Sequence, residues 1–139
     1  NSNPKGDGDT EEILSELAGF SYQSLKQLKR TSPFVFGLPP TKVRSVLEYL
    51  TNILQYGKNL VPDRIPKVLG TLVVAHPYLL NLGVETNLKP RVEFLSTSCG
   101  LNVTDVAKLV QSSGGSVLGL SVNENLKPTM AFLSVLLQN

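Results

Sequence analysis

The chain has 139 residues, enough for one modest domain, and its 41% of apolar residues is sufficient for a hydrophobic core. With one cysteine and one histidine, the sequence excludes a disulfide framework, a zinc site built from several cysteines and most Ser–His chemistry. The net charge of +2 divides unevenly: residues 1–19 hold five acidic residues and one lysine (−4), whereas residues 20–139 hold 12 basic and six acidic residues (+6). A basic body suits a polyanionic partner, or simply a basic soluble protein.

The N-terminal residues 1–9 are rich in Asn, Gly, Asp and Pro and predict a disordered linker, so we expect the folded part to span residues 10–139. Asp9-Thr10-Glu11-Glu12 has the pattern of a capping box and predicts the start of a first helix. The longest apolar stretch, residues 68–82, is interrupted by a His-Pro pair and is shorter than the roughly 20 residues of a spanning helix. No membrane partner is therefore expected.

The middle of the chain predicts one long helix, because six apolar residues follow the i, i+3, i+4, i+7 spacing of a buried stripe. These residues are Val43, Val46, Leu47, Leu50, Ile53 and Leu54. The apolar segments 33–38 and 77–82 are too short for a full helix and predict single tight turns. Pro90 lies inside the next helical segment, where a helix either bends or starts its regular part. Asn102 and Gly100 predict the cap of a following helix and the left-handed end of a preceding one.

An internal repeat organises these elements. Residues 84–95 recur as residues 122–133 at an offset of 38, with Asn-Leu-Lys-Pro and Phe-Leu identical, and residues 43–50 are a weaker copy at an offset of 45. Three units of about 40 residues, approximately 10–50, 51–95 and 96–139, fill the chain, and this period is typical of helical solenoids. No strand pattern competes, so we predict an all-α helical-repeat solenoid.

The last segment has apolar residues on more than one face. Leu126, Met130, Leu133 and Leu137 form one stripe, whereas Phe132, Val135 and Leu136 lie elsewhere on the predicted helix. These last three residues are a candidate interface. A terminal capping repeat normally presents a polar outer face. We therefore expect a following repeat, a second copy of the chain or a protein partner to cover this face, and the natural protein to continue beyond residue 139.

The repeated motifs in residues 77–80, 84–95 and 100–110 resemble the mitochondrial transcription termination factor (mTERF) family, and the Asn-Leu-Lys-Pro motif resembles its plant-type members. The resemblance implies units of two α-helices and a short 3₁₀ helix stacked into a curved solenoid. It also implies an organellar factor that binds double-stranded DNA or RNA in transcription termination, transcription regulation or RNA processing. The plant-type motif favours the chloroplast over the mitochondrion. The family has no common catalytic site, and no cofactor is implied.

Cations at equivalent positions of the repeat are the candidate nucleic-acid-binding residues. Arg44, Lys89 and Lys127 form one row, Lys67 and Lys108 form a second, and Arg91 is a further candidate. Such rows bind a phosphate backbone, or they are ordinary solvated faces with local pairs, for example Lys89 with Glu93. A protein-interaction scaffold that uses the concave face or the C-terminal apolar face is the alternative function.

The remaining distinctive side chains favour structural roles. Tyr22, Tyr49, Tyr56 and Tyr78 either stack on bases or pack at the boundary of the core. The single histidine, His76, and the single cysteine, Cys99, lie in apolar surroundings and indicate no catalytic or metal site. We therefore expect a binding protein and not an enzyme.

Overall fold

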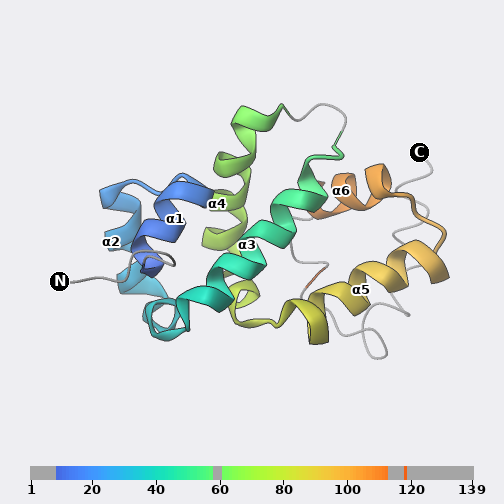
Figure 1. Cartoon of the computed structure of the whole chain (residues 1–139). Helices are drawn as coiled ribbons and strands as arrows, with labels where there is room; N and C mark the ends of the chain where they lie inside the picture. The colour runs from blue at the N-terminus through green and yellow to red at the C-terminus, as the bar shows by residue number, and fades with distance from the viewer. Residues whose placement is uncertain (1–8, 58–60, 113–117, 119–139) are drawn as a thin grey trace.

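The computed structural model describes residues 9–57, 61–112 and 118, and within these residues it contains helices and turns but no β-strand. The all-α fold predicted from the sequence is therefore confirmed (Figure 1). The elements in chain order are α1 (Thr10–Ala18), α2 (Tyr22–Thr31), η1 (Pro33–Gly37), α3 (Pro40–Leu54), η2 (Pro62–Arg64), α4 (Ile65–Ala75), η3 (Pro77–Asn81), η4 (Val84–Leu88), α5 (Lys89–Glu93), η5 (Phe94–Ser98) and α6 (Val103–Ser112).

The elements follow a repeating order of two helices and a short 3₁₀ turn. This order occurs as α1, α2 and η1, and again as α3, α4 and η3. A third pair starts with the continuous helical stretch η4–α5–η5, followed by α6. We call α1, α3 and η4–α5–η5 the first helices, and α2, α4 and α6 the second helices. The unit boundaries near residues 50 and 95 stay an interpretation, because these helices can be grouped into units in more than one way.

Side-chain caps fix where three helices begin. The Asp9 carboxylate accepts the Glu12 backbone N–H at 2.9 Å, and the Glu12 carboxylate accepts the Asp9 N–H at 3.4 Å, so the predicted capping box is present. Ser21 caps α2 in the same reciprocal way. The Asn102 side chain accepts the Asp105 N–H at 2.8 Å ahead of α6, as predicted. Each cap satisfies a backbone donor that the first turn leaves unpaired.

Two glycines end first helices in the left-handed conformation. Gly19 has φ 67° and Gly100 has φ 71°, and they are the described residues with positive φ. The following N–H then bonds six residues back, from Phe20 to Leu14 at 3.2 Å and from Leu101 to Leu95 at 3.1 Å. This pairing is the Schellman arrangement, which turns the chain sharply into the next helix.

The helix around Pro90 combines α and π geometry. A π-helical turn, η4, precedes Lys89, and the Lys89 N–H donates to the carbonyl of Val84, five residues back. Regular α geometry starts at Lys89, with Pro90 in its first turn, where the missing N–H is tolerated. A second π turn, η5, closes the helix. The regular part of this helix therefore starts beside the proline.

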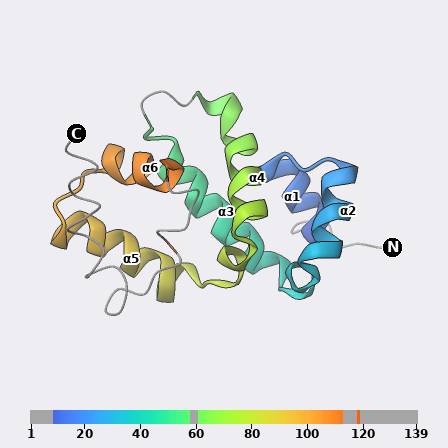
Figure 2. The same cartoon turned by 180° about the vertical axis from the view of Figure 1, so that it is seen from behind.

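The core lies between the helices of neighbouring pairs. Helix α3 crosses the middle of the molecule, α1 packs against both α3 and α4, and α6 packs against α3 (Figures 1 and 2). Leu14, Leu50 and Leu95, one from each first helix, are all fully buried. No helix among the described residues is long and apolar enough to cross a membrane.

Candidate nucleic-acid interface

Most basic residues of the described ranges fall into two groups according to the helix that carries them, and exposed Arg64 lies apart, on the short turn η2 before α4. The first-helix cations lie on α3 and on η4–α5–η5: Lys42, Arg44, Lys89 and Arg91. The second-helix cations lie on α2, α4 and α6: Lys26, Lys29, Arg30, Lys67 and Lys108. Individual cations differ in whether a carboxylate already pairs with them: Lys29, Arg44 and Lys89 have such a partner.

Arg44 is bound to two carboxylates. Its Nη2 lies 3.6 Å from Glu16 on α1 and its Nη1 lies 3.5 Å from Glu48, one turn further along α3. The Arg44 side chain is only 28% exposed, and its Nε is buried without a hydrogen-bond partner. The guanidinium thus bridges two first helices, and a phosphate would have to displace a carboxylate to reach it.

Lys89 is paired on its own helix. Its Nζ lies 2.8 Å from Glu85, four residues earlier, so Glu93 was the wrong partner in the sequence-based alternative. Both side chains are well exposed, and exposed pairs of this kind stabilise by only about 0–1 kcal/mol. Lys42 is likewise occupied, because its Nζ donates to the Asn81 side chain at 3.3 Å.

Arg91 connects its helix to the turn that follows α6. Its Nη1 donates to the backbone carbonyl of Leu118 at 2.5 Å, and Leu118 is fully buried. Partial burial lowers the pKa of Arg91 from its usual value, because desolvation disfavours the charged form. Arg91 therefore has a structural contact between segments 27 residues apart in the chain.

Lys67 and Lys108 are different. Both are exposed, and neither has a hydrogen bond or an ion pair from its ammonium group to any residue in the described ranges. Each lies on the same kind of helix face, two residues from a buried residue on either side: Ile65 and Leu69 flank Lys67, and Val106 and Val110 flank Lys108. Both members of the second predicted row thus have no ammonium partner among the described residues.

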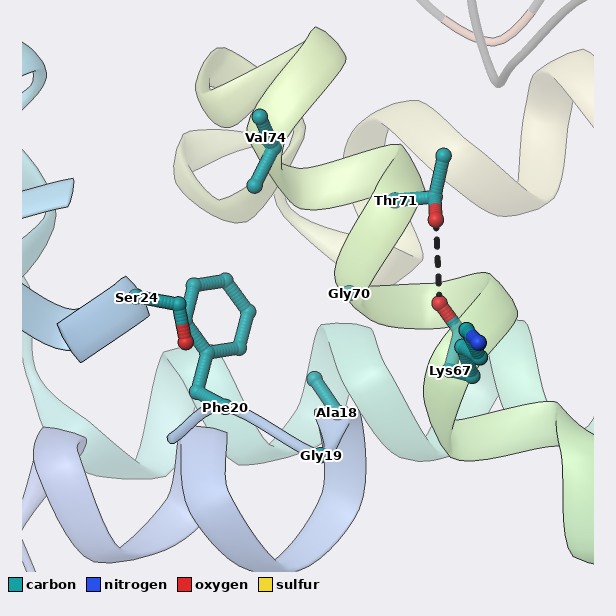
Figure 3. A pocket seen from close by; sticks show the side chains of 8 residues that line it. All are labelled: Ala18, Gly19, Phe20, Ser24, Lys67, Gly70, Thr71 and Val74. Carbon is teal, nitrogen blue, oxygen red and sulfur yellow. Dashed lines mark hydrogen bonds between the residues drawn. The ribbon is translucent and has the colours of Figure 1, made fainter. Parts of the chain in front are cut away.

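A hollow of about 200 Å³ lies beside Lys67, between α2 and α4 (Figure 3). The ring of Phe20 points into the space between these two helices, and the end of α1 at Ala18 and Gly19 closes its floor. Ser24 lines the α2 side, and Thr71 and Val74 line the α4 side. The hollow is open, so Lys67 stands at the rim of a concave and partly apolar surface.

A larger groove of about 510 Å³ separates α3 from the start of the η4–α5–η5 helix. Its charged lining is balanced, because Lys42 and Lys89 face Glu48 and Glu85. Burial raises the pKa of Tyr49 in this groove, and the nearby carboxylates of Glu93 and Glu85 raise it further. This groove has no excess of positive charge to attract phosphate.

Reactive side chains are scarce in the part of the chain that the structure covers. No group of three or more His, Cys, Asp or Glu side chains there is placed to hold a metal ion. His76 packs edge-to-face on Tyr78, with ring centroids 5.5 Å apart. Burial raises the pKa of the Cys99 thiol, which disfavours the nucleophilic thiolate. Both residues therefore have the properties of structural side chains.

Several candidates fall outside the described residues: Lys127 of the first row, and Phe132, Val135 and Leu136 of the proposed interface. In the other direction, the sequence analysis did not nominate the exposed face of α2. The signal for it was present, because α2 contains Lys26, Lys29 and Arg30 but no acidic residue.

Comparison with known proteins gives one match. A family model described as mTERF matches residues 11–137 of the chain. No curated protein and no solved structure matches it.

Proposed function

The chain belongs to the mTERF family of helical-repeat proteins, which bind nucleic acid in organellar gene expression, and we propose that it holds the phosphate backbone of its target through Lys67 and Lys108. The observation that carries this proposal is the contrast between cations with and without a carboxylate partner among the described residues. The ammonium groups of Lys67 and Lys108 have no partner among the described residues and lie on similarly flanked faces of α4 and α6, whereas Arg44 and Lys89 already contact carboxylates. A free cation gains a phosphate contact without first giving up a partner.

The first-helix cations have a secondary part in this proposal. Lys89 exchanges Glu85 for a phosphate at little cost, because its present ion pair is exposed. Arg44 and Arg91 instead hold the first helices and the turn at Leu118 in place, and so position the basic surface. Lys127 would extend the first row by one repeat.

The biological process and the compartment are inferred from the family and not from the geometry of the candidate interface. Family members are generally non-enzymatic, and we propose that this chain acts by binding alone, in transcription termination or regulation or in RNA processing. We place it in an organelle, with the chloroplast favoured because of the plant-type repeat motif. Double-stranded DNA and RNA are both candidate targets.

A protein-interaction scaffold is the second candidate. The groove between α3 and the η4–α5–η5 helix supports it, since Lys42, Glu48, Glu85 and Lys89 balance one another there. Balanced, polar grooves suit polypeptides better than polyanions.

Two double variants with the same change of charge distinguish these functions. Lys67→Glu with Lys108→Glu alters the second helices, and Lys42→Glu with Lys89→Glu alters the first. Binding to a duplex DNA and to a single-stranded RNA is measured from about 50 to 300 mM salt. We expect the second-helix variant to lose most binding to both probes. We also expect the slope of log affinity against log salt to become shallower by an amount that corresponds to about two phosphate contacts.

The matched first-helix variant controls for net charge. We expect it to weaken binding less, because Lys89 already pairs with Glu85 and both lysines line a groove in which Glu48 and Glu85 balance their charge. Equal losses in both variants would mean that overall charge, and not this surface, drives binding. A wild-type chain that binds neither probe at low salt would leave the scaffold as the better explanation.

A further inference from the structure

Helix α2 presents basic and aromatic side chains to solvent. Its apolar residues Leu25 and Leu28 are buried in the core. Tyr22, Lys26 and Arg30 are spaced four residues apart along the helix, and all three are exposed. Helical geometry separates successive members of this line by about 6 Å along the axis. No acidic residue on α2 neutralises them.

These side chains remain exposed to solvent, although the Lys26 ammonium lies over one side of the Tyr22 ring. Tyr22 is 75% exposed, the largest value among the large apolar side chains of the described residues, and the Lys26 ammonium lies 5.7 Å from its ring centroid. The Arg30 guanidinium donates to the neutral side chain of Gln27 at 2.7 Å, which orients it without cancelling its charge. Lys29 does not belong to this line, because it pairs with Glu11 on α1.

An exposed aromatic ring in line with two cations that have no carboxylate partner among the described residues suits one kind of ligand. The ring offers a flat surface to an unpaired base, and the cations offer contacts to the phosphates on either side. A duplex hides the faces of its bases in the stack, so only a single strand uses both parts of the line. An anionic membrane is a poorer fit, because the apolar side of α2 is already buried in the core and has nothing to insert.

We propose that Tyr22, Lys26 and Arg30 form a subsite for a single-stranded nucleic acid, with one base stacked on Tyr22 and adjacent phosphates on Lys26 and Arg30. The subsite rests on the proposed function and adds α2 to α4 and α6 as a nucleic-acid-binding helix. It adds a preference that Lys67 and Lys108 do not supply, since lysine contacts to phosphate do not distinguish paired from unpaired strands.

The test uses a mixed-sequence single-stranded RNA of about 12 nucleotides and the same RNA annealed to its complement. We expect Tyr22→Ala to weaken binding of the single strand about fivefold or more, in line with the loss of one stacked base, and to change duplex binding less than about twofold. Lys26→Glu with Arg30→Glu is expected to weaken both. Because Tyr22 is mostly exposed, the melting temperature should stay unchanged, which controls for folding.

A second measurement reports stacking directly. The chain has no tryptophan, so in Tyr22→Trp all indole emission comes from this position. We expect the single strand to quench that emission with the same affinity as it binds, and the duplex to leave it nearly unchanged. Equal effects of Tyr22→Ala on both probes, or no quenching by a single strand that binds, would overturn the subsite and leave the proposed function intact. Absence of wild-type binding to either probe would instead remove both.

Discussion

The backbone carbonyl oxygen of Ala18, at the end of α1, lies 2.6 Å from the position that a Cβ atom would take on Gly70 of α4. Real Cβ atoms essentially never come this close to another atom, so α1 and α4 pack at this distance only because position 70 lacks a side chain. The same close approach forms the floor of the hollow beside Lys67 (Figure 3).

Gly70→Ala is therefore expected to destabilise the fold. Alanine favours a helix over glycine by about 1 kcal/mol, but pushing two packed helices apart costs about 1–3 kcal/mol. We expect a net loss of about 1 kcal/mol in the free energy of unfolding, measured by urea denaturation. Gly37→Ala is the matched control, since a Cβ there meets nothing within 4 Å. An increase in stability for Gly70→Ala would show that the helices shift at no cost.

Substitutions at Gly100 measure the cost of backbone conformation separately from that of a steric clash. A Cβ at this position meets no atom within 4 Å, but its φ of 71° is unfavourable for residues with a side chain. We expect Gly100→Ala to lower the free energy of unfolding by about 1 kcal/mol, and Gly100→Asn to lower it less, because asparagine tolerates the left-handed region. Equal losses for the two variants would contradict an origin in backbone conformation.

Arg91 is expected to contribute to the stability of the fold, whereas Lys67 is expected to contribute little. Arg91→Met removes the donor to the Leu118 carbonyl while keeping much of the apolar stem, and we expect a loss of about 1–2 kcal/mol. Lys67→Met removes the same charge from an exposed position without a described partner, and we expect a change within about 0.5 kcal/mol. Similar melting temperatures for the two variants would argue against the structural role of Arg91.

Tyr49 is expected to make the fold sensitive to alkaline pH. Its pKa is raised in the folded state by burial and by Glu93 and Glu85, so the folded chain holds the phenol proton more tightly than the unfolded chain does. The resulting stabilisation is complete below the unfolded pKa of about 10 and is lost as the pH rises through the higher folded value. We expect the free energy of unfolding to fall more steeply above pH 10 in the wild type than in Tyr49→Phe. Parallel pH profiles would contradict this.

Much of the fold was readable from the sequence because its signals are local. The capping box at Asp9, the cap at Asn102 and the left-handed end at Gly100 depend on residues within one turn of each other, and all were confirmed. The buried stripe of α3 matched the predicted residues for the same reason. Pro90 was ambiguous, because both a bend and a new start of the helix accommodate a residue without a backbone N–H. The structure shows that regular α geometry starts at Lys89, after a π turn.

The candidate interface was only partly readable. The repeat identified positions that are equivalent, and it placed Lys67 and Lys108 in one row and Arg44 and Lys89 in another. It did not reveal their partners, because Glu16 and Arg44 are 28 residues apart and belong to different helices. The same limit concealed the exposure of Tyr22, which depends on how α2 packs.

The sequence by itself determined that this chain is an all-α repeat protein of modest net charge, with a basic body and few reactive side chains. These properties follow from composition, periodicity and short-range backbone preferences, and none of them requires a tertiary contact. The tertiary structure alone decided which cations are free. Packing brings carboxylates to Arg44 and a buried carbonyl to Arg91, whereas it leaves Lys67 and Lys108 without a described partner, because Coulomb attraction depends on separation in space and not along the chain.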